Sequence, residues 1–281
     1  MGHLGAMVAG RAMGAKWWVA SATRWVGFAA LSIGLMGVAG SAGRRVTRPG
    51  NGRMAGLPRL TVWAWERRED LRGLDVRTTA VAYLDRTVEV GGSGVFVAPR
   101  REAMLLPAST GLVRIAVVRI EVTPGTVLSE GEADEVSRAV AGAAAQGGIG
   151  ALQVDFDARL SERGWYAGVL RRVRAQMPAG MPLSMTALAS WCSYDGGWMR
   201  DLPVDEAVPM LFRMEPDRKL RGVGPDADGG DYALREPLCL GSVGISTREA
   251  WPRDVRERRV YVFADRGWVR DGLEATVREL E

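Results

Sequence analysis

Histidine is almost absent from this chain, whose 281 residues contain one, His3. A Ser-His-Asp triad, a Cys-His pair and a zinc site with histidine ligands all need a histidine in the folded part. Because His3 lies in the N-terminal leader considered below, the sequence excludes these three kinds of site. Chemistry in the folded part must therefore rest on carboxylates, tyrosine, serine or threonine hydroxyls, or arginine.

Cysteine is scarce as well, and its two copies are Cys192 and Cys239. Two cysteines are too few for a disulfide framework, and their separation fits no CxxC metal motif. A single bridge is compatible with an exported protein, but we predict two free, partly buried thiols.

An excess of charge is also missing from most of the chain. The formal net charge is +4, and the first 42 residues contribute Arg11, Lys16 and Arg24 without any acid. The remainder is therefore almost neutral, and it has no stripe of basic residues interleaved with aromatics of the kind that binds nucleic acid. Apolar and charged fractions of 47% and 25% are typical of a globular protein.

The N-terminal residues 1–43 have the pattern of a signal peptide or membrane anchor. Basic residues precede an uncharged run over 25–42 that ends in small residues. Its glycine content favours a cleaved signal, whereas its length is enough for an uncleaved anchor. We expect an exported periplasmic or extracellular protein that touches a membrane only through this segment. Residues 44–58 are expected to form a flexible linker, and 59–281 one folded domain.

Strand-like apolar segments alternate mostly with helix-like ones over the folded part. The strand candidates are 60–65, 79–84, 113–122, 151–158, 183–188, 206–213, 238–245 and 259–264. Helices are predicted over 67–74, 129–146, 161–176 and 271–280, the second starting with a capping box formed by Ser129 and Glu132. This order predicts an α/β fold, a (β/α)8 TIM-type barrel.

A glycine-rich stretch, 91–94, lies between two further strand-like segments and indicates a β-hairpin insertion after strand 2. The competing fold is an open doubly wound sheet. That fold is disfavoured because no glycine-rich nucleotide loop follows the first strand.

The fourth strand candidate carries two carboxylates at its C-terminal end. Val154 and Phe156 face one side, and Asp155 and Asp157 face the other, because side chains alternate along a strand. Further acids follow the first two strands, at Glu66 and Asp85, and a third, Glu121, lies on the third strand. Acids at the C-terminal ends of barrel strands usually belong to the site, and crowding raises the pKa of at least one of them.

Glycoside hydrolysis needs one carboxylic acid to protonate the leaving oxygen and a second group to stabilise the charge that develops. We predict that Asp157 positions or stabilises the reacting group, that Asp155 tunes it, and that Glu121, Glu66 or Glu206 donates the proton. The structural alternatives are an ion pair of Glu66 with Arg67 or Arg68 and one of Glu121 with Arg119. No cofactor and no resident metal are predicted.

Aromatic side chains at strand ends suggest how a polysaccharide or oligosaccharide would bind, because sugar rings stack on indole. For any single tryptophan the alternative is packing in the core. The predicted substrate-binding residues are Trp63, Trp65, Tyr83, Asp85, Trp191, Glu206, Met210, Arg213 and Trp268.

Three segments resemble a bacterial domain-of-unknown-function family, number 3142. They are Leu152-Gln153-Val154-Asp155-Phe156-Asp157-Ala158, Leu183 to Cys192 and Leu202 to Arg213. The likeness extends over about residues 58–270 and implies a barrel, and it implies no reaction.

A more distant similarity is to the chitinase-like family-eighteen glycosidases, whose fourth strand ends in Asp-x-Asp-x-Glu. Asp155 and Asp157 match the two aspartates, but Arg159 stands where the proton-donating glutamate is expected. The sixth-strand pattern Met-x-Tyr-Asp reads Met210-Leu211-Phe212-Arg213 here. These departures place the substrate-assisted mechanism of that family in doubt.

Three functions remain open at this point. The first is an exported glycoside hydrolase-like barrel that acts on an envelope or extracellular polysaccharide. The second is a catalytically inactive glycan-binding barrel, which Arg159 favours. The third is a Mg²⁺- or Ca²⁺-dependent phosphoester hydrolase with Asp155, Asp157 and Glu121 as oxygen ligands.

Overall fold

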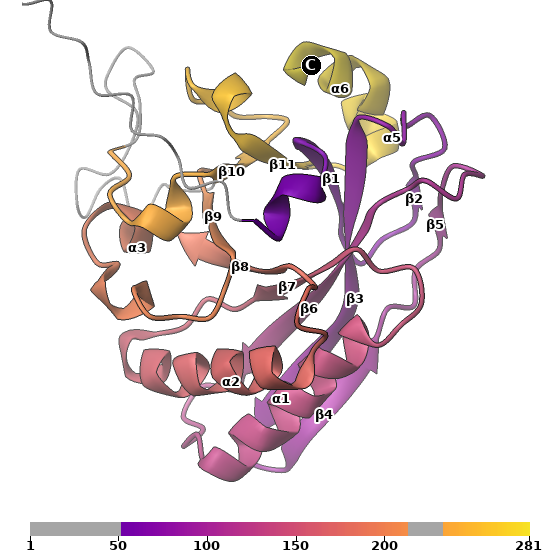
Figure 1. Cartoon of the computed structure of the whole chain (residues 1–281). Helices are drawn as coiled ribbons and strands as arrows, with labels where there is room; N and C mark the ends of the chain where they lie inside the picture. Colours follow the sequence, from indigo (N-terminus) through magenta and orange to yellow (C-terminus); the bar gives the residue numbers. More distant parts are fainter. Residues whose placement is uncertain (1–51, 213–232) are drawn as a thin grey trace, which may run out of the picture. The chain divides into compact units, whose positions relative to one another are not determined.

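The computed structural model of the chain describes residues 52–212 and 233–281 (Figure 1). The predicted leader, most of the predicted linker and Arg213 lie outside the described residues. All the described residues belong to one compact unit. Among the helices of the described part, none is long and apolar enough to cross a membrane.

Eight of the described strands close into a parallel barrel. In order around the ring they are β1 (Leu60–Ala64), β3 (Thr79–Gly91), β6 (Arg114–Val122), β7 (Ala151–Asp155), β8 (Leu183–Leu188), β9 (Glu206–Met210), β10 (Ser242–Ser246) and β11 (Arg259–Phe263). The ring closes at β1, where Leu60 lies opposite Thr79 on one side and Val260 on the other. The predicted (β/α)8 barrel is confirmed.

Side chains that point into the barrel fill its interior. The interior cluster consists of Trp63, Ala80, Ala82, Ile115, Val117, Ala151, Val208, Tyr261 and Phe263. Polar groups in this region bond to one another: Gln153 donates to Ser184 at 2.6 Å, and Tyr261 donates to Glu206 at 2.5 Å. The interior is thus a packed core, as in other barrels of this kind.

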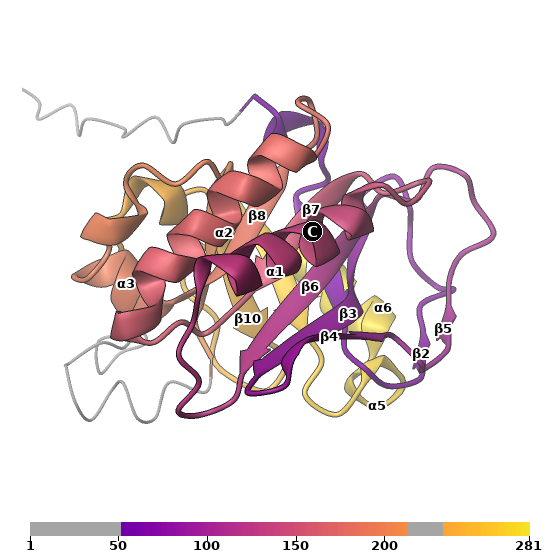
Figure 2. The same cartoon turned by 90° about the horizontal axis from the view of Figure 1, so that it is seen from below.

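The two longest helices lie side by side, and α1 (Glu130–Ala144) packs against β3, β4 (Gly94–Pro99), β6 and β7 (Figures 1 and 2). Helix α1 begins with the predicted capping box of Ser129 and Glu132. The turn η2 (Leu160–Glu162) leads into α2 (Arg163–Gln176), which buries Val169, Leu170 and Val173.

A hairpin continues the second barrel strand beyond the ring. Strand β3 runs on to Gly91 and pairs antiparallel with β4 (Gly94–Pro99), and Gly94 adopts a φ of 104° that favours glycine. The pairing of β3 with β6 shifts register between Leu84 and Arg86, which is a β-bulge. The hairpin therefore grows out of the second barrel strand itself.

The predicted helix over residues 67–74 is wrong. No helix forms there: β2 (Glu69–Asp70) pairs with β5 (Met104–Leu105) in a separate short sheet, and residues 72–73 form a turn. The Glu69 carboxylate, almost fully buried, accepts hydrogen bonds from Arg67 and from the backbone N–H of Trp268. These tertiary contacts outweigh the local helical pattern.

The C-terminal part of the predicted linker belongs to the barrel. Residues Met54–Gly56 form a 3₁₀ turn, η1, and Met54 is buried. Arg53 forms an ion pair with Asp205 at 2.9 Å, and Arg259 donates to the Met54 carbonyl at 2.6 Å. The remaining short elements are α3 (Ala189–Ser193), η3 (Gly197–Met199), η4 (Pro237–Cys239), η5 (Val255–Glu257), α5 (Trp268–Asp271) and α6 (Leu273–Leu280).

Cys192 and Cys239 form a disulfide, so the predicted free thiols are wrong. Their Cα atoms lie 5.7 Å apart, although 47 positions separate them in the sequence. The backbone N–H groups of Arg235 and Glu236 both donate to the Cys192 carbonyl, which brings the two segments together. This proximity is a property of the fold, and a count of two cysteines does not reveal it.

Candidate functional site

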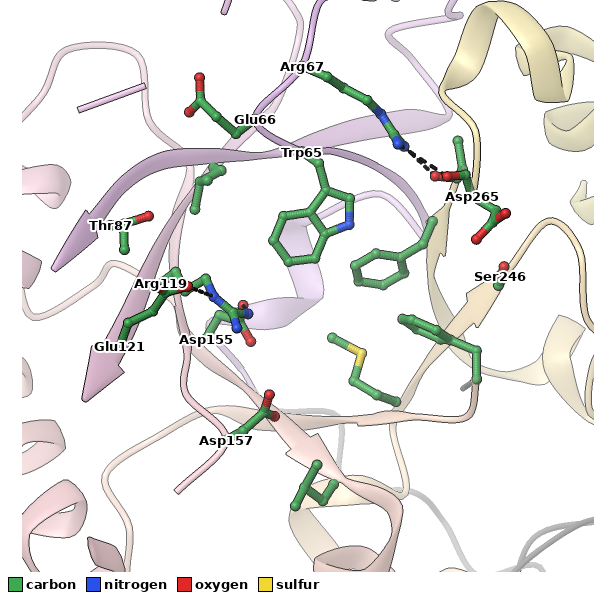
Figure 3. Close-up of a pocket in the computed structure, with 16 residues that line it drawn as sticks. Trp65, Glu66, Arg67, Thr87, Arg119, Glu121, Asp155, Asp157, Ser246 and Asp265 are labelled. Atoms are coloured by element: carbon green, nitrogen blue, oxygen red, sulfur yellow. Dashed lines mark hydrogen bonds and ion pairs between the residues drawn. The ribbon is translucent and has the colours of Figure 1, made fainter. Parts of the chain in front are cut away.

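A cavity of about 730 Å³ opens at the C-terminal ends of the barrel strands (Figure 3). Every barrel strand, or the segment directly after it, contributes to its wall. The lining residues are Trp65, Glu66, Arg67, Leu84, Thr87, Arg119, Glu121, Asp155, Asp157, Leu188, Met210, Phe212, Ser246, Phe263, Ala264 and Asp265. All four predicted catalytic residues are in this set.

Asp155, the last residue of β7, is nearly buried, and two neighbouring strands hold its carboxylate. Arg119 of β6 donates to Oδ2 and Thr186 of β8 donates to Oδ1, both at 2.8 Å. The contact with Arg119 is an ion pair, and Thr186 holds the other oxygen in place. Asp155 is therefore a fixed negative charge in the floor of the cavity.

Asp157 differs from Asp155 although both face the same cavity. It lies two residues beyond β7 and has no hydrogen-bond or ion-pair partner among the described residues. Its side chain is accessible from the cavity, yet the surrounding protein partly replaces bulk water. This desolvation raises the pKa of Asp157, the negative charge of Asp155 raises it further, and the positive charge of Arg119 partly opposes both. Asp157 is the carboxyl in this cavity that is best suited to hold a proton.

Glu121 and Glu66 lie at the rim and are both exposed. Glu121 accepts a hydrogen bond from Arg119 at 2.8 Å, which is the predicted structural alternative. Glu66 forms neither predicted ion pair, because Arg67 pairs with Glu69 instead. One oxygen of Glu66 accepts from two successive backbone N–H groups, at residues 101 and 102, each at 2.9 Å.

An apolar wall faces the acids. Phe263 lies between Trp65 and Phe212, with ring centroids 6.2 Å and 4.7 Å away, and Met210 completes the surface. The guanidinium of Arg119 lies 5.8 Å from the centroid of Trp65, which is a cation–π distance. Among the predicted substrate-binding residues that the structure describes, Trp65 and Met210 line the cavity.

The other predicted aromatic residues are buried in the core. Trp63, Trp191 and Trp268 have 0–1% of their surface exposed, and Tyr83 has 8%. Trp63 stacks on Phe263 inside the barrel, and the Trp268 indole donates to the Trp63 carbonyl at 2.8 Å. Packing, the alternative for each single tryptophan, is the role of these four side chains in the fold.

Two predicted polar residues also lie away from the cavity. Asp85 pairs with Arg86 at 2.6 Å and accepts from Gln146 on the outer face. Glu206 starts β9 and is buried near the N-terminal end of the barrel, where it contacts Tyr261 and Arg259. Because the packed interior separates it from the cavity, Glu206 cannot donate a proton there.

The sequence patterns did not reveal the roles of Arg119 and Thr186, which hold Asp155, or of Phe263, whose ring lines the cavity. The alternation of side chains along the third strand does indicate Arg119, since it places Arg119 on the same face as Glu121. The strand alternation also applies to Phe263, but its role depends on which face of the last strand points inward.

A second, smaller hollow of about 270 Å³ adjoins the cavity and shares Arg119, Glu121 and Asp157 with it. Arg159, at the position of the expected glutamate, lines this hollow. Its guanidinium lies 3.7 Å from Glu162, whose other oxygen accepts from the Arg159 backbone N–H at 2.7 Å. No proton donor therefore occupies that position.

The acids of the cavity do not form a metal centre among the residues that the structure describes. No group of three or more His, Cys, Asp or Glu side chains is arranged to hold an ion there. Both oxygens of Asp155, one of the three ligands of the predicted Mg²⁺ or Ca²⁺ site, already accept hydrogen bonds from Arg119 and Thr186. Asp155 would therefore have to give up these contacts to act as the predicted metal ligand.

Comparison with known proteins gives structural similarities alone. No family model and no curated protein matches the sequence, so the resemblance to family 3142 stays a prediction. The structure is similar to the putative Chitinase A of Streptomyces coelicolor, with 13% identity, a TM-score of 0.49 and coverage of 79% of this chain and 95% of that one. It is also similar to a family GH18 chitinase of Chromobacterium violaceum, with 10% identity, a TM-score of 0.48 and coverage of 77% and 81%. Similarities at this level identify no substrate or activity, and the strand pairing alone establishes the barrel.

Proposed function

We propose that this protein is a glycoside hydrolase-like barrel in which Asp157 protonates the leaving oxygen of a bound polysaccharide. The observation that carries the proposal is the state of Asp157: its pKa is raised, it has no partner among the described residues, and it faces an aromatic-walled cavity. A carboxyl that keeps its proton is what a glycosidase uses as its acid. Asp157 thereby replaces Glu121, Glu66 and Glu206 as the proposed donor.

The fixed charge of Asp155 supports this role in two ways. It opposes ionisation of Asp157, and it supplies negative potential where positive charge develops on the sugar ring. Glu121 is the accessible second carboxylate, and in the proposal it activates the attacking water or the reacting group. Trp65 and the neighbouring rings provide a surface on which a sugar stacks.

We further propose that the protein is exported and that its substrate is an envelope or extracellular polysaccharide. The disulfide between Cys192 and Cys239 supports export, because such bridges persist in oxidising compartments. The charge and apolarity pattern of residues 1–43 supports it independently.

The second candidate function is glycan binding without cleavage. Arg159 favours it, because an arginine stands at the position from which the family-eighteen glycosidases donate their proton. The aromatic wall would serve a binding protein equally well.

One assay separates the two candidates. The purified protein would be incubated with a panel of envelope and extracellular polysaccharides, and the release of reducing ends and the binding of oligosaccharides would be measured together. Cleavage of at least one member supports the hydrolase. Binding without the release of reducing ends supports the catalytically inactive glycan-binding barrel. The absence of both binding and cleavage contradicts a saccharide function.

The pH dependence of cleavage follows from the raised pKa of Asp157. The protonated, competent form of Asp157 predominates below that pKa and is lost as the pH rises through it. We therefore expect kcat/KM to fall with increasing pH from a point above the usual titration range of an aspartic acid. A profile that keeps rising through neutral pH would contradict Asp157 as the acid.

A further inference from the structure

We infer that the ligand of this cavity carries positively charged amino groups, as an oligosaccharide of amino sugars that are not N-acetylated does. The inference rests on the proposed function, since it takes the cavity as a saccharide site. It concerns the charge of the ligand, which the aromatic wall and the proton donor leave open.

The wall of the cavity has an excess of negative charge. Five of its lining side chains carry carboxyl groups and two carry guanidinium groups. The acids are Glu66, Glu121, Asp155, Asp157 and Asp265. Even with Asp157 protonated, the acids outnumber the bases, and a concave site enclosed by low-dielectric protein strengthens the resulting potential.

The two cations of the wall are already engaged. Arg67 donates to the carboxylate of Glu69, which lies outside the wall, and to the backbone carbonyls of residues 264 and 265. Arg119 divides its charge between Glu121 and Asp155. Neither guanidinium is available for an anionic ligand, so sugars that bear carboxylate, sulfate or phosphate groups fit this wall poorly.

Glu66 is the acid best placed to receive an ammonium group. Its Oε1 accepts the backbone N–H groups of residues 101 and 102, and no partner of Oε2 is found among the described residues. These two bonds hold the carboxylate at the rim, and Figure 3 shows it directed away from the Trp65 ring. The arrangement offers an ammonium an anchored carboxylate with one oxygen that has no partner among the described residues.

Binding an amine at Glu66 is compatible with proton donation by Asp157. Figure 3 shows Glu66 and Asp157 on opposite sides of the Trp65 ring. An ammonium directly beside Asp157 would favour its ionised form and weaken it as an acid. Distance from Asp157 therefore makes Glu66 a better amine site than the carboxylates around Asp155.

The neighbouring hollow does not reverse this conclusion. It adds Arg159, which is exposed, but it also adds Glu162, which contacts Arg159 at 3.7 Å. The described surface that continues the cavity in this direction therefore gains no net positive charge.

The test compares ligands that differ in charge alone. Fully de-N-acetylated β-1,4- and β-1,6-linked glucosamine oligomers, their N-acetylated counterparts and an oligogalacturonate of equal length would be titrated calorimetrically into the full chain. The pH would be mildly acidic, so that the amines are protonated. We expect the amine oligomer of one linkage to bind at least about tenfold more tightly than its N-acetylated form, with an advantage that shrinks as salt screens the charges.

Substitution of Glu66 assigns the effect to one side chain. Glu66→Gln keeps an oxygen that accepts the two backbone bonds and removes the charge. It should weaken binding of the amine oligomer about five- to tenfold and leave the N-acetylated oligomer within about twofold. Glu135→Gln, the same change on the exposed face of α1, should alter neither affinity.

The outcomes separate this inference from the proposed function. Equal or tighter binding of the N-acetylated or acidic oligomer overturns the amine preference and leaves the saccharide site standing. An amine preference that Glu66→Gln does not reduce overturns Glu66 as its source. If no oligomer of any charge binds, and the polysaccharide panel also gives neither binding nor cleavage, the proposed function falls together with the inference.

Discussion

Asp157→Asn is expected to reduce the release of reducing ends by about 10²- to 10⁴-fold, the range that a general acid contributes. The amide has the shape of the carboxyl group but cannot transfer a proton to the leaving oxygen. Because Asp157 has no hydrogen-bond or ion-pair partner among the described residues, the substitution breaks no contact there. Glycan affinity should therefore stay within about threefold of the wild type, and the effect should appear in kcat rather than in KM.

Stability supplies an internal control for this variant. A carboxyl whose pKa is higher in the folded than in the unfolded state contributes stability that is present at low pH and is lost as the pH rises through the folded-state pKa. The substituted amide does not titrate, so the Asp157→Asn variant should unfold at neutral pH no more easily than the wild type. A variant that loses activity and also melts at a clearly lower temperature would point to a structural role.

A matched surface variant completes the comparison. Asp134→Asn makes the same change on α1, where the carboxylate pairs with Arg172 and is exposed. Surface pairs of this kind contribute at most about 1 kcal/mol, so cleavage should be unchanged. If cleavage survives Asp157→Asn but disappears with Glu121→Gln, the proton donor is Glu121 and not Asp157.

The barrel was predictable because the patterns that indicate its strands and helices are local. The segment 183–188 was predicted to the residue, and the helix after Ser129 starts at its capping box. These features depend on neighbours within a few positions. The extended segment at Glu69 was missed, because its conformation depends on Trp268 and on β5, which lie far away in the sequence.

The acids of the site were predictable for a similar reason, whereas most of its aromatic residues were not. The C-terminal ends of parallel strands meet at one end of a barrel, so Glu66, Glu121, Asp155 and Asp157 had to approach one another. Whether a tryptophan near a strand end lines the cavity depends on its position along the barrel axis. Trp63 and Trp65 share a strand face, yet the first stacks below Phe263 in the core and the second reaches the cavity.

The disulfide had no signal in the sequence beyond a count of two, and its removal is the second large effect that we expect. Replacing both Cys192 and Cys239 by alanine should lower the free energy of unfolding by about 3–4 kcal/mol. The reason is the 47-position separation, because a link across a long loop restricts the unfolded chain. Urea denaturation of the wild type and the double variant, without reductant, measures the difference.

Two controls isolate the bond from the packing of the sulfur atoms, since both cysteines are fully buried. Wild-type protein unfolded in the presence of a reductant keeps both sulfur atoms and loses the link, so it should show most of the same destabilisation. The double variant should not respond to the reductant. Titration of the unreduced, denatured wild type with a thiol reagent should find no free thiol. Two reactive thiols in that titration would show that the cysteines are free, as the sequence predicts. The disulfide would then no longer support export. The barrel and its cavity do not depend on the bond and would be unaffected.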